Sequence, residues 1–232
     1  MRVSDDQYVL VPLYHGTSKR FLPSIRGSGL GGTYPCEVSR CHQLLDDLAE
    51  LEGWDWSEDP DLCILKPTID CMRARTVTAG GFNFRYGGTY VFASCRSAVR
   101  YATSNRYGSE LLSNAMAVLD KLFDHDPTRA QEIAEKHQIC PDLRHLAAQP
   151  VLVEANQVPI RILKSERGDD ASVQIERMQQ FADKSPGGRI PVIWDQMNFE
   201  LIAPVPSKML HYYDIHCDSR TDRGNFTLQE IP

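Results

Sequence analysis

The chain has 232 residues, 42% of them hydrophobic and 24% charged, so it can bury a core as one compact domain with a sizeable insertion. Its net charge of −6 argues against a broadly electropositive surface that holds nucleic acid non-specifically, but it does not exclude a local basic groove. Seven scattered cysteines, an odd number, argue against a disulfide framework and for reduced thiols.

No apolar run approaches the roughly 18 residues that a membrane-spanning helix requires, and the first residues lack the apolar stretch of a secretory signal. We therefore expect no membrane partner and a cytoplasmic protein, or an effector that is delivered into a host cytoplasm. The cysteines and histidines form no Cys-x-x-Cys knuckle, so we expect no metal site.

The N-terminal part is predicted to begin with a strand over 8–14 that leads into a corner at His15. A short helix follows over 18–28, with Pro23 in its first turn and glycine at its end. The insertion is expected at 36–75, with a helix over 43–52 followed by a turn.

This insertion is acidic between Asp46 and Asp61, where eight acidic residues and no basic one accompany Trp54 and Trp56. Such a stretch is typical of a solvated face. The alternative is a surface or lid whose tryptophans contact a partner, such as an antitoxin.

The remaining elements alternate irregularly between strands and helices. The patterns predict strands over 74–79, 88–93, 150–164 (broken at Pro159), 190–194, 199–205 and 209–216, and helices over 95–107, 110–123, 128–138 and 171–183. Asp126 or Pro127 is expected to start the helix at 128. Pro204 and Pro206 are expected to interrupt a strand, because proline removes a ladder bond. The tail at 217–232 is polar and expected to be loosely held. This order predicts an α+β fold in a single domain, 1–232.

Three short motifs stand apart from this scaffold. Tyr14-His15-Gly16-Thr17 follows an apolar run, and Gly88-Thr89-Tyr90 opens a second strand with Ser97 and Tyr101 behind it. Asn198-Phe199-Glu200 opens a third apolar segment. Together they resemble the His-Tyr-Glu site of the ADP-ribosyltransferases, in the poly(ADP-ribose) polymerase and diphtheria-toxin branch.

The resemblance covers residues 9–34, 80–105, 150–164 and 190–216. It implies the ADP-ribosyltransferase fold, in which two small, mainly antiparallel sheets decorated by helices hold NAD in the cleft between them. It also implies a mono-ADP-ribosyltransferase that splits NAD as its substrate and passes ADP-ribose to a protein or nucleic-acid acceptor. By the same resemblance, such small domains are often bacterial or phage toxins.

The implied catalytic residues are His15, Tyr90 and Glu200. When nicotinamide leaves, the ribose becomes oxocarbenium-like, so NAD must be held still with a carboxylate near the developing cation. The resemblance implies that Glu200 binds the ribose 2′-hydroxyl and stabilises this cation, and that His15 binds the adenosine-side ribose. Tyr90 and Tyr101 would stack on the nicotinamide ring.

Four more residues are implied in binding. The backbone of Gly16 would pair with the carboxamide, Thr17 stands where the family has Ser or Thr, and Ser97 lies near the family's carboxamide-binding serine. Asn198, two residues before the glutamate, argues against arginine as the acceptor. Its amide could pair with a nucleobase edge or another amide.

Three other functions stay open. A related NAD-dependent RNA 2′-phosphotransferase would need basic residues around a phosphate, for which Arg20, Arg26 and Arg85 are candidates. The chain could instead be an NAD glycohydrolase, or an inactive module that binds ADP-ribose or a partner.

Overall fold

A computed structural model describes residues 7–33, 36–51, 56, 59–74, 76–79, 82–85, 87–139, 147–166, 168–184, 195, 197–217 and 225–232. The chain divides into two compact units. Unit 1 comprises Met1–Thr33, Gly88–Gly108 and Ala148–Pro232, and unit 2 comprises Tyr34–Gly87 and Ser109–Ala147. The insertion expected at 36–75 therefore belongs to a larger unit, to which a second segment of the chain contributes. Among the described residues, no helix is long and apolar enough to cross a membrane.

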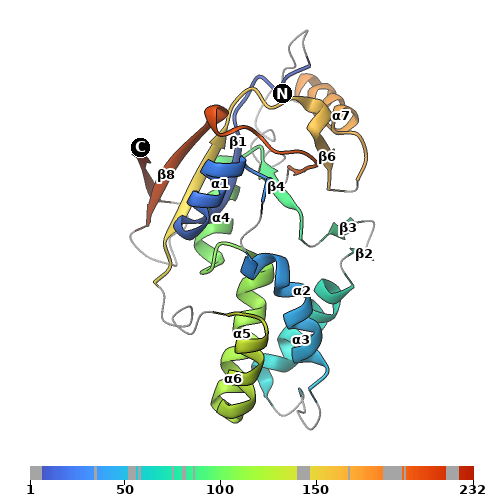
Figure 1. Ribbon diagram of the computed structural model, residues 1–232. Coiled ribbons are helices and arrows are strands. Elements are labelled where there is room, and N and C mark those ends of the chain that lie inside the picture. The colour runs from blue at the N-terminus through green and yellow to red at the C-terminus, as the bar shows by residue number, and fades with distance from the viewer. Residues whose placement is uncertain are drawn as a thin grey trace. The chain divides into compact units, whose positions relative to one another are not determined.

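Unit 1 is built on a seven-stranded sheet in which neighbouring strands are antiparallel, in the order β6-β7-β4-β1-β5-β8-β9 (Figure 1). The strands are β1 (Leu13–Ser18), β4 (Thr89–Phe92), β5 (Pro150–Ala155), β6 (Leu163–Ser165), β7 (Asn198–Leu201), β8 (Leu210–Cys217) and β9 (Phe226–Ile231). The helices are α1 (Leu22–Ser28), α4 (Cys95–Ser104) and α7 (Ala171–Lys184), and short 3-10 turns cover Lys19–Phe21, Ile160–Ile162 and Ser207–Met209. The α+β class is therefore confirmed.

The two faces of this sheet are covered by different helices. On one face Ala98 and Ala102 of α4 pack with Leu152 of β5 in a buried apolar cluster. On the other face the Arg26 guanidinium of α1 lies 5.0 Å from the centre of the Tyr212 ring of β8. Because alternate residues of a strand point to opposite faces, the register divides the sheet into an α4 face and an α1 face. The α4 face includes Tyr14, Phe92, Leu152 and Tyr213.

The sheet is weakly joined in its middle. The register between β1 and β4 contains a single residue pair, Tyr14 opposite Phe92, whereas β1 and β5 share six pairs from Leu13 to Ser18. The expectation of two small sheets in this unit is therefore wrong in number. The strands form one sheet of two halves, β6-β7-β4 and β1-β5-β8-β9, joined at that pair.

Pro204 and Pro206 do not interrupt a strand, because β7 already ends at Leu201. Val205, which lies between them and has an N–H, exchanges two backbone hydrogen bonds with Leu30, at 3.0 and 2.9 Å. The prolines thus flank an isolated bridge, where their missing donors are not needed.

The C-terminal tail is more ordered than predicted. Phe226–Ile231 forms β9, which pairs with β8 from Tyr212 opposite Ile231 to Cys217 opposite Phe226. Its residues are mostly exposed, so the strand is held by its backbone ladder and by Phe226, which packs against the buried cluster on the α4 face. Phe226 and Leu228 do alternate with Thr227 and Gln229, a strand signal that the polar composition of the tail obscures.

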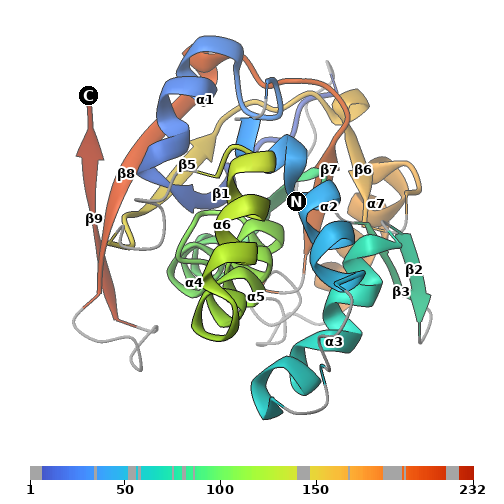
Figure 2. The ribbon, with the colours of Figure 1, turned by 60° about the horizontal axis from the view of Figure 1, so that its bottom comes forward.

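Unit 2 is mainly helical, with α2 (Cys36–Ala49), α3 (Pro60–Arg73), α5 (Glu110–His125), α6 (Pro127–Lys136) and a hairpin of β2 (Thr76–Ala79) and β3 (Phe82–Arg85) (Figure 2). Leucines at helical spacing form its core, and Leu44, Leu48, Leu112 and Leu119 are fully buried. The Asp126 side chain accepts a bond from the backbone N–H of Arg129, so the predicted cap of α6 is confirmed.

The acidic stretch of unit 2 holds basic residues of neighbouring helices. Asp46 and Glu50 pair with Arg73 at 2.9 and 2.8 Å, and Asp59 and Asp61 pair with Lys121 at 3.0 and 2.8 Å. Asp47 meets Lys136 and the buried His137, both at 2.6 Å. Burial raises the pKa of Asp47, but these hydrogen bonds outweigh it and lower the pKa overall. Trp56 is buried, and Trp54 lies outside the described residues.

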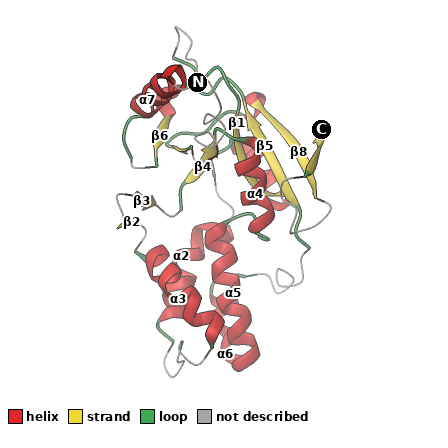
Figure 3. Ribbon diagram, turned by 180° about the vertical axis from the view of Figure 1, so that it is seen from behind, coloured by secondary structure: helices red, strands yellow, loops and turns green. Residues whose placement is uncertain are grey.

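Several helices and strands, which Figure 3 colours by type, begin or end at other residues than predicted. His15 lies inside β1 rather than at a corner after it, and α2 starts at Cys36. Helix α3 stands where only a turn is predicted after the helix at 43–52. Pro60 occupies the first turn, where Asp59 caps the helix. The strand predicted at 190–194 lies outside the described residues.

Candidate active site

Tyr90 and Glu200 lie directly opposite each other on the neighbouring strands β4 and β7. The side chains of such a pair share one face, with Cβ atoms about 4.5–5.5 Å apart. An ideal Cβ at Gly88 would lie 2.9 Å from Glu200 Oε1 and 3.3 Å from Tyr90 Cε2. The missing side chain of Gly88 therefore leaves room for the carboxylate and the ring edge, and two of the predicted catalytic residues meet here.

His15 is joined to β4 through the main chain of Tyr90. Its Nδ1 lies 2.8 Å from the Tyr90 carbonyl oxygen, which can only accept, so Nδ1 carries the proton. Burial lowers the pKa of His15 and is a larger influence than the carbonyl bond, which raises it. The ring is therefore neutral at pH 7, with Nε2 as a hydrogen-bond acceptor.

The three predicted catalytic residues are linked as a chain rather than as one cluster. Tyr90 and Glu200 share the α4 face, because Tyr90 lies two residues from Phe92 on the same strand. Alternation along β1 assigns His15 to the α1 face. The ring of His15 reaches Tyr90 where the β1–β4 register has stopped, so a side chain replaces a ladder bond between the two halves of the sheet.

Tyr101 and Asn198 both lie beside Phe92 on the α4 face. The ring centre of Tyr101 is 5.9 Å from that of Phe92, with the planes tilted by 45°, and Asn198 is the cross-strand partner of Phe92. Asn198 Oδ1 is buried, and no hydrogen-bond partner for it occurs in the part of the chain that the structure describes. Such an atom favours binding of a ligand that donates a hydrogen bond to it.

Ser97 is engaged with the segment that precedes β7. Its hydroxyl donates to the Asp195 carbonyl at 2.7 Å, and the Ser94 hydroxyl donates to the Asp195 carboxylate. The backbone N–H of Ala93 also donates to the carbonyl of Met197, at 3.1 Å. The start of α4 thus holds the entry to β7. Sequence reasoning did not single out Asp195, because no motif connects it with α4.

Gly16 and Thr17 have packing roles in the structure. An ideal Cβ at Gly16 would lie 2.0 Å from the Ala98 carbonyl oxygen, so α4 crosses β1 at the glycine itself. The buried Thr17 hydroxyl donates to the Gly108 carbonyl at 3.1 Å. The β1–β4 register does not include either residue, and their contacts with NAD stay predictions.

Lys164 is a site neighbour that sequence reasoning missed. On β6 it lies opposite Glu200, on the side of β7 away from Tyr90. The three side chains therefore form a row across β6, β7 and β4. Only the register shows this, since a three-residue strand gives no sequence signal of its own.

Glu154 of β5 lies opposite Tyr14, beside the same face. Burial and the Glu154 charge raise the pKa of Tyr14 to about 12, and the same two influences raise the pKa of the Cys95 thiol. Both groups therefore stay protonated near neutral pH, and Cys95 lacks the low pKa of a nucleophilic thiol.

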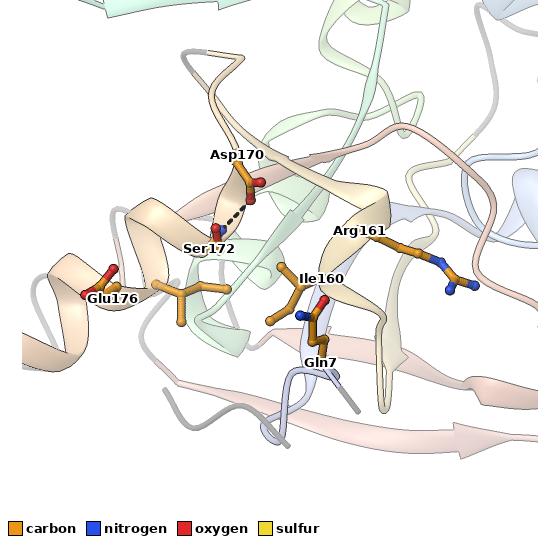
Figure 4. Close-up of a pocket in the computed structure, with 7 residues that line it drawn as sticks. Gln7, Ile160, Arg161, Asp170, Ser172 and Glu176 are labelled. Carbon is orange, nitrogen blue, oxygen red and sulfur yellow. Dashed lines mark hydrogen bonds between the residues drawn. The ribbon is translucent and has the colours of Figure 1, made fainter. Parts of the chain in front are cut away.

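A cavity of about 390 Å³ opens elsewhere in unit 1, between α7 and the 3-10 turn before β6 (Figure 4). It is lined by Gln7, Ile160, Arg161, Asp170, Ser172, Ile175 and Glu176. The Asp170 carboxylate accepts the backbone N–H of Ser172 at 2.8 Å, which lowers the pKa of Asp170. Asp170 thus has a local role in the turn before α7. The predicted site residues line no part of this cavity.

No protein-family model, curated protein or solved structure matched this chain. A group of three or more metal-ligating side chains does not occur among the described residues.

Proposed function

We propose that this protein is a mono-ADP-ribosyltransferase that cleaves NAD, releases nicotinamide and transfers ADP-ribose to a macromolecular acceptor. The observation that carries the proposal is the chain of contacts from His15 through the Tyr90 carbonyl to Glu200. These residues come from three separate strands, and the motifs that predict them lie 75 and 110 positions apart. A chance set of three residues would not be expected on adjoining strands.

The chemistry follows from the position of each group. The Glu200 carboxylate, held against Gly88, is the negative charge that stabilises the oxocarbenium-like ribose. His15 Nε2 accepts a ribose hydroxyl, because Nδ1 is already committed to Tyr90. Since His15 belongs to the α1 face and Glu200 to the α4 face, the bound NAD must span the junction at which the β1–β4 ladder ends. Tyr90 and Tyr101 supply the aromatic surfaces for the nicotinamide ring.

The fold proposed with this function is that of the ADP-ribosyltransferases. Support comes from the two halves of the unit 1 sheet, which meet at a single residue pair beside the site residues. Asn198 has the role of acceptor recognition, since its buried Oδ1 lies on the Glu200 face next to that junction.

The test is nicotinamide release from NAD by the purified chain, measured with and without cell lysate. Glu200→Gln keeps the shape of the side chain and removes its charge, and we expect a loss of turnover of about 100-fold or more. Glu176→Gln, an exposed change on α7, is the matched control and should leave turnover unchanged.

Release that rises with lysate and depends on Glu200 supports a transferase. Release that depends on Glu200 but does not rise when lysate is added would instead indicate an NAD glycohydrolase. If Glu200→Gln turns over as fast as the control, the role assigned to the carboxylate is wrong. Loss of phosphate from a 2′-phosphorylated oligonucleotide in the presence of NAD would favour the phosphotransferase.

A further inference from the structure

The charge of the chain is divided unequally between its two units. Unit 2 contains 9 Lys and Arg against 17 Asp and Glu, a net −8, whereas unit 1 contains 16 against 14, a net +2. These values add to the −6 of the whole chain. A negative net charge therefore disfavours nucleic-acid binding by unit 2, whereas the unit that contains Glu200 has a net positive charge.

Helix α4 carries two exposed arginines that its own stability does not explain. Arg96 and Arg100 lie one turn apart, where like charges repel by about 0.2–0.5 kcal/mol, and α4 contains no acidic residue. Arg96 is also in the first helical turn, where the macrodipole disfavours a cation. Within the described residues, neither arginine forms an ion pair.

This basic row lies beside the candidate site. Successive residues of a helix are rotated by about 100°, so Arg96 and Arg100 form the row next to Ser97 and Tyr101. Tyr101 is the residue that packs near Phe92 on the α4 face. The arginines therefore occupy the solvent side of the helix that borders the Glu200 face.

Lys164 adds a third cation on that same face. It is the cross-strand neighbour of Glu200, is partly exposed, and makes no ion pair within the described ranges, although Asp170 lies next to it across a backbone bridge. Three carboxylates accompany these cations: Glu154 accepts from Asn156 at 3.0 Å, Asp195 accepts from Ser94, and Glu200 lies opposite Lys164. The donors to Glu154 and Asp195 are neutral, so both carboxylates keep their charge.

We propose that the acceptor is a nucleic-acid strand, whose phosphates are held by Arg96 and Arg100 on the solvent side of α4 and by Lys164 on the α4 face of the sheet. This inference rests on the proposed function, because only a transferase has an acceptor, but binding of a nucleic acid can be measured whether or not the protein is a transferase. A phosphate backbone has the charge density that Arg96, Arg100 and Lys164 favour, whereas a cationic protein side chain would be repelled by the two arginines.

The experiment measures binding of a fluorescein-labelled, mixed-sequence single-stranded oligonucleotide, as RNA and as DNA, by anisotropy over a range of salt concentrations. The logarithm of the binding constant should fall linearly with the logarithm of salt. For single strands each lost phosphate contact reduces the slope by about 0.7, so Arg96→Gln/Arg100→Gln should reduce it by about 1.4. Adding Lys164→Gln should bring the reduction to about 2.

Arg177→Gln/Lys208→Gln is the matched control, because it removes the same charge from two exposed positions on α7 and before β8. The inference is overturned if the control reduces the slope as much as the α4 pair, or if the wild type binds neither oligonucleotide. It is also overturned if radiolabel that the protein transfers from NAD to lysate resists nuclease and is removed by protease. That result would still support the proposed transferase, because a protein would then be the acceptor. Binding with the expected slopes but without nicotinamide release would support the nucleic-acid-binding surface and refute the proposed transferase.

Discussion

Replacing Gly16 with alanine is expected to drive a methyl group into the backbone of α4. The ideal Cβ would lie 2.0 Å from the Ala98 carbonyl oxygen and 2.9 Å from the Ala102 nitrogen. Ordinary contact begins at 3.4 Å, so the first approach is 1.4 Å too short (3.4 − 2.0). Because both atoms belong to the helix backbone, no side-chain rotation can relieve the overlap.

The expected loss of stability is large. Overpacking a core typically costs about 1–3 kcal/mol, and we expect at least about 3 kcal/mol here, since a whole helix must move. For a chain of this size each kcal/mol shifts the melting temperature by about 2–4 °C, which gives a decrease of about 6–12 °C. The measurement is thermal unfolding followed by circular dichroism.

Gly27→Ala is the control for this change. Gly27 lies inside α1, and an ideal Cβ there meets nothing within 4 Å. Alanine should therefore stabilise the helix by about 0.5–1 kcal/mol relative to glycine. If Gly16→Ala melts with the wild type, α4 does not cross β1 at this residue. A stable Gly16→Ala variant that loses only nicotinamide release would show that the glycine is there for NAD.

Two further substitutions separate the chemistry from the packing. Gly88→Ala places its Cβ 2.9 Å from Glu200 Oε1, the far end of a flexible side chain, so the carboxylate should move aside. The free energy of unfolding should fall by less than about 1 kcal/mol, while nicotinamide release falls at least about 10-fold. Unchanged release would show that this carboxylate position is not the active one. Thr17→Val leaves the buried Gly108 carbonyl without the Thr17 hydroxyl as donor and should lower the free energy of unfolding by about 1–3 kcal/mol in urea. Thr103→Val removes a hydrogen bond at a partly exposed position on α4 and should change stability by less than about 0.5 kcal/mol. Equal effects would refute the role given to Thr17.

The helices of unit 2 show what the sequence predicts well. Helices α5 and α6 follow from apolar spacing and from the Asp126 cap, because a helix is specified by residues close together in the chain. Helix α3 was missed although its start has two local signals, the Asp59 cap and Pro60 in the first turn. Both signals are close together in the chain, so long-range information was not what was lacking.

The site shows where sequence reasoning stops. His15, Tyr90 and Glu200 could be selected from three motifs, but the row from Lys164 through Glu200 to Tyr90 depends on which strands pair and in which register. Register is decided by contacts between segments far apart in the chain, and β6 is only three residues long. The link from Asp195 to Ser94 and Ser97 is missed for the same reason, since about a hundred residues separate the partners.

The position of His15 also bears on how variants of the site should be interpreted. Its Nδ1–H bond to the Tyr90 carbonyl stands where the ladder between β1 and β4 has ended, so the ring both joins the halves of the sheet and presents Nε2. Removing it would disturb structure and chemistry together. Glu200 belongs to a strand whose backbone is paired on both sides, with β4 and with β6. A substitution of Glu200 therefore probes the reaction separately from the fold, and it should be the first test of this site.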